Sequence, residues 1–187
     1  MNQATYLNNQ FIIAMPTLAD PNFFHTVAYL CQHNEDGALG IVINRPTDMK
    51  LGEIFKQMDI DVAVPAVAQT PVFAGGPVQL ERGFVVHTAG GSWNASMAVS
   101  DTISLTTSRD VLEAIAVGEG PKQYLVALGY AGWGAGQLEK EIMNNAWLNT
   151  PCGKRVLFET PVNQRWSAAA DQIGIDINLL TAPAGHG

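Results

Sequence analysis

The 187-residue chain has little charge, little cysteine and no long hydrophobic run. Charged residues make up 14% of it, and Cys31 and Cys152 are its only cysteines. The longest apolar runs, at 11–15 and 41–43, are far shorter than the roughly 20 residues that a membrane-spanning helix needs, so no membrane association is expected. Two cysteines do not form a disulfide framework, which favours a reducing, cytoplasmic location.

Basic residues are also scarce. Ten Lys and Arg stand against seventeen Asp and Glu, giving a formal charge of -7. No run of Lys or Arg offsets this charge, so phosphate backbones are repelled and no direct nucleic-acid binding is expected. Segment 1–10 has neither the basic start nor the apolar core of a signal peptide, in keeping with a cytoplasmic protein.

The apolar content of 47% and the length suit a compact protein with a real core, expected as a single domain over 1–187 or as a domain with a small second lobe. Strand and helix patterns alternate loosely, which predicts an α/β, mixed α+β fold with a mixed sheet flanked by helices. The expected helices cover 51–58, 107–117 and 161–173, and the expected strands 11–15, 72–74, 83–88, 103–105, 124–128 and 155–158.

The clearest local signal is a hairpin formed by 27–33 and 38–44 around Asp36-Gly37. Strand alternation places Cys31 and His33 on one face, together with Tyr29, Gly40 and Val42. A thiol and an imidazole on one face are candidates for nucleophilic catalysis in a hydrolase-type enzyme. The alternative is a buried Cys31 beside a His33 that caps the turn. Zinc is not expected, because four ligands at a recognisable spacing are missing.

Segment 129–141 contains four glycines around Trp133, and it is expected to be a loop between a strand and a helix. Gln137 and Glu141 lie four residues apart on that helix, so both should face a small polar ligand placed against Trp133, with Glu141 as a candidate general base. The glycine spacing fits neither a dinucleotide nor a phosphate loop, and no cofactor is expected. Alternatively, the segment is a helix entry in which Gln137 caps the backbone.

Two further turns carry groups that suit an anion. Asn44-Arg45 and Gly75-Gly76 follow strands, and Arg82 lies close to the second turn in sequence. Arginine beside exposed backbone N–H groups can bind a carboxylate or phosphate. The alternative is turn chemistry, with the arginines paired to acidic neighbours such as Glu81.

Motifs along nearly the whole chain resemble the bacterial AlgH/YqgE-like family. They are Ala-Met-Pro at 14–16, Asp-Pro-Asn-Phe at 20–23, Cys-Gln-His at 31–33, Gly-Ala-Leu-Gly at 37–40, Asn-Arg-Pro at 44–46, Gly-Gly-Pro-Val at 75–78, Arg-Gly-Phe at 82–84, His87, Leu-Gly-Tyr-Ala at 128–131, Gly-Gln-Leu-Glu at 136–139, Asn-Ala-Trp-Leu at 145–148 and Ala-Gly-His at 184–186. The resemblance implies an α/β fold with a bulged mixed sheet and implies no reaction. One branch of that family is associated with regulating exopolysaccharide gene expression.

Together these features predict a cytoplasmic regulatory or ligand-binding protein that affects gene expression indirectly, through a protein partner. The expected ligand is small and polar or anionic. The competing hypothesis is a hydrolase-type enzyme that uses Cys31 with His33.

Overall fold

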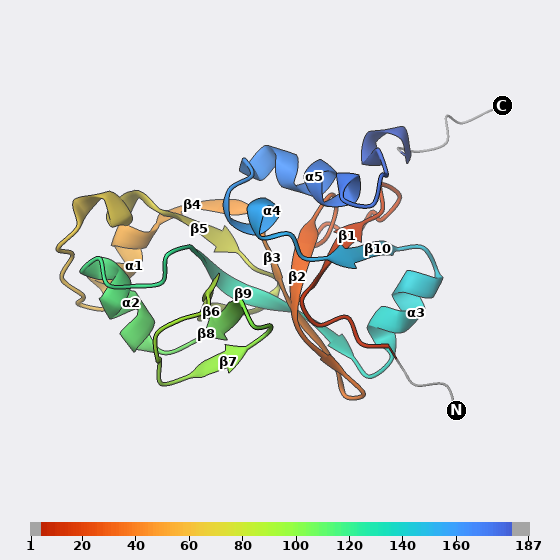
Figure 1. Cartoon of the computed structure of the whole chain (residues 1–187). Helices are drawn as coiled ribbons and strands as arrows, with labels where there is room; N and C mark the ends of the chain where they lie inside the picture. Colours follow the sequence, from red (N-terminus) through yellow and green to blue (C-terminus); the bar gives the residue numbers. More distant parts are fainter. Residues whose placement is uncertain (1–4, 181–187) are drawn as a thin grey trace.

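The computed structural model describes residues 5–180 and has a mixed α+β architecture, as predicted (Figure 1). A curled, mainly antiparallel sheet runs through the molecule, and five α-helices pack around it in the described part of the chain. The Ala-Gly-His motif at 184–186 lies outside the described residues.

The sheet has one continuous path of neighbouring strands, with a two-strand branch. The path is β10 (Trp147–Pro151), β1 (Gln10–Ala14), β2 (Val27–Asn34), β3 (Gly37–Val42), β9 (Tyr124–Gly134), β6 (Val78–Thr88), β8 (Ile103–Thr106) and β7 (Ser96–Ala98). On the branch, β4 (Pro46–Lys50) pairs with β5 (Pro71–Ala74), and β5 pairs in parallel with β9, which makes the sheet mixed.

Strand β9 belongs to both parts of the sheet. Its first half pairs with β5 and β6, and its second half, from Ala131 to Gly134, pairs with β3. Gly129 has a φ of 78°, in the region that favours glycine, where the strand passes from one part to the other. The glycine-rich segment is therefore strand as far as Gly134, and the prediction of a loop there was wrong. Glycine allows the two halves to approach closely at this crossing.

The α-helices are α1 (Leu51–Gln57), α2 (Arg109–Ala116), α3 (Gln137–Met143), α4 (Lys154–Phe158) and α5 (Arg165–Asp171), with short 3-10 helices at η1 (Pro65–Gln69), η2 (Val162–Gln164) and η3 (Ile177–Leu180). The helices expected at 51–58 and 107–117 are confirmed. The strand expected at 155–158 is wrong: the run is helix α4, which buries Val156 and Leu157. Short apolar runs fit a buried helix as well as a strand.

Three apolar clusters form the core. One packs beneath α4 and α5 and includes Phe11, Tyr29 and Leu157. The second lies between α1, α2 and the sheet, and the third includes Leu138 of α3. Figure 1 shows α1 and α2 at one end of the molecule and α3 at the other. The three clusters are therefore separate layers on the faces of the sheet, and strand β9 passes from one layer to another.

The hairpin is confirmed, but the predicted distribution of its side chains is wrong. A bulge between Leu30 and Gln32 inserts Cys31 as an extra residue, so Leu30 pairs with Gly40 and Gln32 with Leu39. An extra residue reverses which face the following side chains occupy. Cys31 therefore packs with Tyr29 in the first cluster, whereas His33 faces α3 on the other side.

Candidate functional site

The two members of the proposed catalytic pair lie on opposite faces of the sheet. Cys31 is 4% exposed, and its thiol makes only a weak contact with the carbonyl of Tyr29, at 3.8 Å. Burial raises the pKa of the Cys31 thiol well above its ordinary value, with a smaller contribution from Cys152. A buried, protonated thiol separated from His33 by the sheet does not form a nucleophile–base pair.

His33 instead ties the N-terminal segment to α3. Its Nδ1 accepts the backbone N–H of Leu7 at 2.9 Å, so the ring proton is on Nε2, which lies 3.0 Å from Oε1 of Glu139. Tyr6 contacts the ring edge-on, and Asn8 accepts the backbone N–H of His33. Both ring nitrogens are therefore occupied within the protein, which indicates a structural role.

Glu141 is also engaged within the protein. Its Oε1 accepts the indole N–H groups of Trp133 at 3.1 Å and Trp147 at 2.9 Å, while Oε2 accepts the Gln137 amide at 2.8 Å. Gln137 in turn accepts the backbone N–H of Gly134. Trp133 is 5% exposed and stacks against Phe23. The structure brings Trp133, Gln137 and Glu141 together as predicted, but as one mutually satisfied network.

The Asn44–Arg45 pair binds backbone near the start of β2. Asn44 accepts the N–H of Val27 and donates to the carbonyl of His25, and Arg45 donates to the carbonyls of Asn22 and Phe24. These hydrogen bonds hold the turn before β2. They correspond to the turn chemistry that was the alternative to anion binding, although the partners are carbonyls rather than carboxylates.

Gly75 and Gly76 lie where β5 passes β9. A Cβ on Gly75 would lie 2.4 Å from the carbonyl oxygen of Gly129, and one on Gly76 would lie 2.1 Å from the carbonyl carbon of Tyr130. These glycines therefore allow strands to cross closely. Arg82 is exposed, lies over the Phe84 ring at 5.2 Å and reaches Gln79 at 3.4 Å. The sequence-predicted residues thus fall in separate places and do not converge on one pocket.

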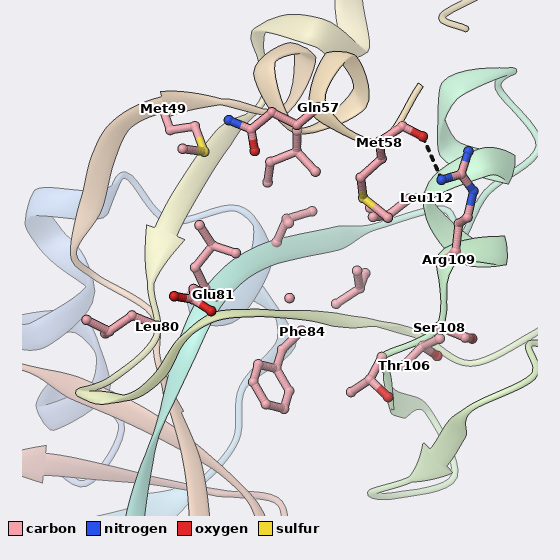
Figure 2. Close-up of a pocket in the computed structure, with 16 residues that line it drawn as sticks. Met49, Gln57, Met58, Leu80, Glu81, Phe84, Thr106, Ser108, Arg109 and Leu112 are labelled. Carbon is pink, nitrogen blue, oxygen red and sulfur yellow. Dashed lines mark hydrogen bonds between the residues drawn. The ribbon is translucent and has the colours of Figure 1, made fainter. Parts of the chain in front are cut away.

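A different site lies between α1, α2 and the sheet. A cavity of about 440 Å³ is present there, within the range typical of small-molecule sites. Figure 2 shows Met49, Met58 and Leu112 around its upper part and Phe84 and Thr106 below. Its remaining apolar lining comes from α1 and from strands β6 and β9: Ile54, Leu80, Val85, Val126 and Leu128.

Polar groups stand at the rim of this cavity. Within the described residues, the side chains of Gln57, Glu81 and Thr107 have no hydrogen-bond partner. Arg109 donates to the carbonyl of Met58 at 2.6 Å, which joins α2 to the end of α1. Figure 2 places Glu81 and Arg109 on opposite sides. An apolar interior with free polar groups at its edge suits an amphipathic molecule.

Sequence reasoning missed this cavity, because its lining comes from four separated segments. Each segment alone has an ordinary pattern: the Leu51, Ile54 and Phe55 stripe of α1 predicts core contact and no more. The one local signal was Gly83, a glycine within a strand, which sometimes marks a place where a ligand approaches the backbone. A Cβ at Gly83 would meet nothing within 4 Å.

Among residues 5–180, no group of three or more His, Cys, Asp or Glu side chains is placed to hold a metal ion. Nor does any helix in this part of the chain have the length and apolar character needed to cross a membrane.

The fold is that of a mixed α+β protein with a curled sheet, and in this chain a pocket lies beneath two short helices. The AlgH-like family model matches residues 11–178, and the chain belongs to this family. The UPF0301 protein of Thioalkalivibrio sulfidiphilus is 58% identical over 186 residues, covering 100% of both chains. The UPF0301 protein of Alcanivorax borkumensis is 53% identical, covering 96% of each.

Two solved structures share the fold. The solution structure of the AlgH protein from Pseudomonas aeruginosa matches with a TM-score of 0.80 and 49% identity over 100% of both chains. A Corynebacterium diphtheriae protein matches with a TM-score of 0.75, covering 98% of this chain and 95% of its own, at 17% identity. At that identity the likeness concerns the fold alone.

Proposed function

We propose that this protein is a cytoplasmic regulatory module that binds a small amphipathic molecule between α1, α2 and strands β6 and β9. The observation that supports this most directly is the 440 Å³ cavity with an apolar interior and unpartnered Gln57, Glu81 and Thr107 at its rim. The apolar part of a ligand would bury against Met49 and Met58, and its polar part would hydrogen-bond at the rim.

The regulatory part of the proposal involves a protein partner. A formal charge of -7 opposes contact with DNA, so an effect on gene expression would be indirect. Residues 1–187 would act as one domain, a view supported by β9, which pairs with strands of both parts of the sheet. The hydrolase alternative has no comparable support, because the sheet separates Cys31 from His33.

The test fills the cavity without disturbing the core. Gly83 lies on β6 opposite Leu128. Strand alternation would direct a side chain introduced at this position to the same face as Val85, toward the cavity. Gly83→Leu should therefore occupy the pocket. Ala98→Leu, on the exposed edge strand β7, is the matched control.

The probe is the amphipathic dye anilinonaphthalene sulfonate. Its binding is followed by NMR through the signals of isotope-labelled methionine methyl groups. Saturable binding should shift the methyl signals of Met49 and Met58 but not that of Met143, which is 82% exposed and does not line the cavity. Gly83→Leu should weaken dye binding by about tenfold or more, whereas Ala98→Leu should not. Unchanged affinity in folded Gly83→Leu, or shifts confined to Met143, would refute the proposal.

A further inference from the structure

Arg165, at the start of α5, is a buried cation without an anionic partner. It is 7% exposed, and among residues 5–180 no carboxylate lies within ion-pair distance of it. An unpaired buried charge is costly, and most buried charges in proteins are paired. Burial alone lowers the pKa of Arg165, with no contribution from a neighbouring acid. The guanidinium is therefore positioned without the charge that would balance it.

Backbone carbonyls and one aromatic ring hold this guanidinium in place. Nε donates to the carbonyl of Thr160 at 2.9 Å, and Nη1 donates to the carbonyl of Ile43 at 2.6 Å. The Phe73 ring lies 5.2 Å from the guanidinium carbon. A guanidinium has more donors than these two bonds use, so Nη2 and the second hydrogen of Nη1 are available. The edge of a guanidinium between Nη1 and Nη2 is one that binds a carboxylate through paired hydrogen bonds.

Arg165 lines a cavity of about 170 Å³ on the α4–α5 side of the sheet. It is the only charged residue of that lining, which is otherwise mostly apolar and includes Phe73, Leu125, Phe158 and Val162. Thr70 and Tyr124 also border the cavity, and the Tyr124 ring packs against the cluster on the α1–α2 side of the sheet. At about 30 Å³ for each water-sized group, the cavity has room for about six non-hydrogen atoms.

We propose that this cavity is a second binding site, which takes a small carboxylate with a short apolar tail. The carboxylate would bind the free edge of the Arg165 guanidinium, and the tail would pack against Phe158 and Val162. A carboxylate fits better than phosphate, because the site offers few donors and a mostly apolar wall. The site shares no lining residue with the cavity beneath α1 and α2.

The test uses butyrate as the probe and butyramide as its neutral counterpart. Butyrate should bind with a dissociation constant on the order of 1 mM, shifting the backbone amide signals of Thr160 and of residues 162–165 in NMR and raising the thermal midpoint. Butyramide should do neither. Equal effects of the two probes, or no saturable shift with butyrate, would overturn the proposal, as would phosphate binding more tightly than butyrate.

Two variants and one control locate the binding. Arg165→Met should weaken butyrate binding by about tenfold or more, whereas Arg155→Met, an exposed arginine on α4, should not. Because Arg165 also tethers α5 to Ile43, directly after β3, its replacement can unfold the protein. Val162→Phe keeps Arg165 and fills the cavity, so it should also abolish butyrate binding. Wild-type affinity in either folded variant would show that butyrate binds elsewhere.

Discussion

The indole N–H of Trp133 donates to Oε1 of Glu141 at 3.1 Å, which joins strand β9 to helix α3. The same oxygen accepts the indole of Trp147, so β10 is tied to the same carboxylate. The two indole rings meet edge to face at 5.9 Å. Trp133, Glu141 and Trp147 thus connect β9, α3 and β10.

Glu141→Gln should destabilise the fold. The substitution replaces one acceptor oxygen with an amide donor, so in either orientation a donor from Trp133, Trp147 or Gln137 meets another donor. Leaving a partly buried donor unsatisfied costs about 1–3 kcal/mol. Urea unfolding measures the change, with the exposed Glu159→Gln as control. Unchanged stability in Glu141→Gln together with lost ligand affinity would restore this segment as a binding site.

Gly76 at the strand crossing and Gly136 at the start of α3 should differ sharply in their tolerance of a methyl group. Gly76→Ala forces a Cβ to within 2.1 Å of the Tyr130 backbone, at a φ of 155°. Gly136 has a φ of 73° with nothing within 4 Å, so Gly136→Ala meets only the strain of a left-handed backbone, about 1–2 kcal/mol. Gly76→Ala should cost more than about 3 kcal/mol or prevent folding. Similar unfolding free energies for the two variants would contradict this account.

The hairpin illustrates what the sequence could and could not predict. Two β-rich runs around Asp36-Gly37 were enough to predict β2 and β3. The bulge at Cys31 was not predictable, because it depends on how β2 pairs with β1 and β3 and leaves no local mark. That single extra residue separates Cys31 from His33 and removes the catalytic pair.

The site shows a similar limit. The contacts between Gln137 and Glu141 followed from their spacing on a helix, but the two indoles that occupy the carboxylate come from β9 and β10. The cavity lining combines Met49, Val85, Leu112 and Val126 from separate elements, each an ordinary core residue in its own segment. Tertiary packing decides which such residues leave a space between them.

Both thiols should react slowly, and Cys31 more slowly than Cys152. Burial raises the pKa of Cys152 to about 12, while Lys154 opposes the shift, and burial raises that of Cys31 further. Cys152 is half-buried and Cys31 almost fully buried. The protein is treated with a disulfide-exchange reagent at neutral pH. Mass spectrometry of the peptides that contain Cys31 and Cys152 then gives the two modification rates. Faster modification of Cys31, with the excess lost in His33→Ala, would support the hydrolase hypothesis instead.

The start of α2 should make stability depend on pH through Asp110. Burial tends to raise the pKa of this carboxyl, but hydrogen bonds from the Ser108 hydroxyl and the Asn94 backbone N–H outweigh it and hold the pKa below its ordinary value. A depressed pKa means that the folded state favours the charged form. The stabilisation is therefore present above the unfolded pKa, about 4, and is lost as pH falls through the lower folded value.

Asp110→Asn removes this charge at every pH. We expect it to lower the unfolding free energy by about 1 kcal/mol at neutral pH, because the helix start and two donors lose their carboxylate, and by less in acid, where the wild-type carboxyl is itself protonated. Urea unfolding across a pH series compares the variant with the wild type and with Asp61→Asn, an exposed aspartate outside α2. If the difference between Asp110→Asn and the wild type stays constant from neutral pH down through the folded pKa, the hydrogen bonds at Asp110 do not favour its ionised form.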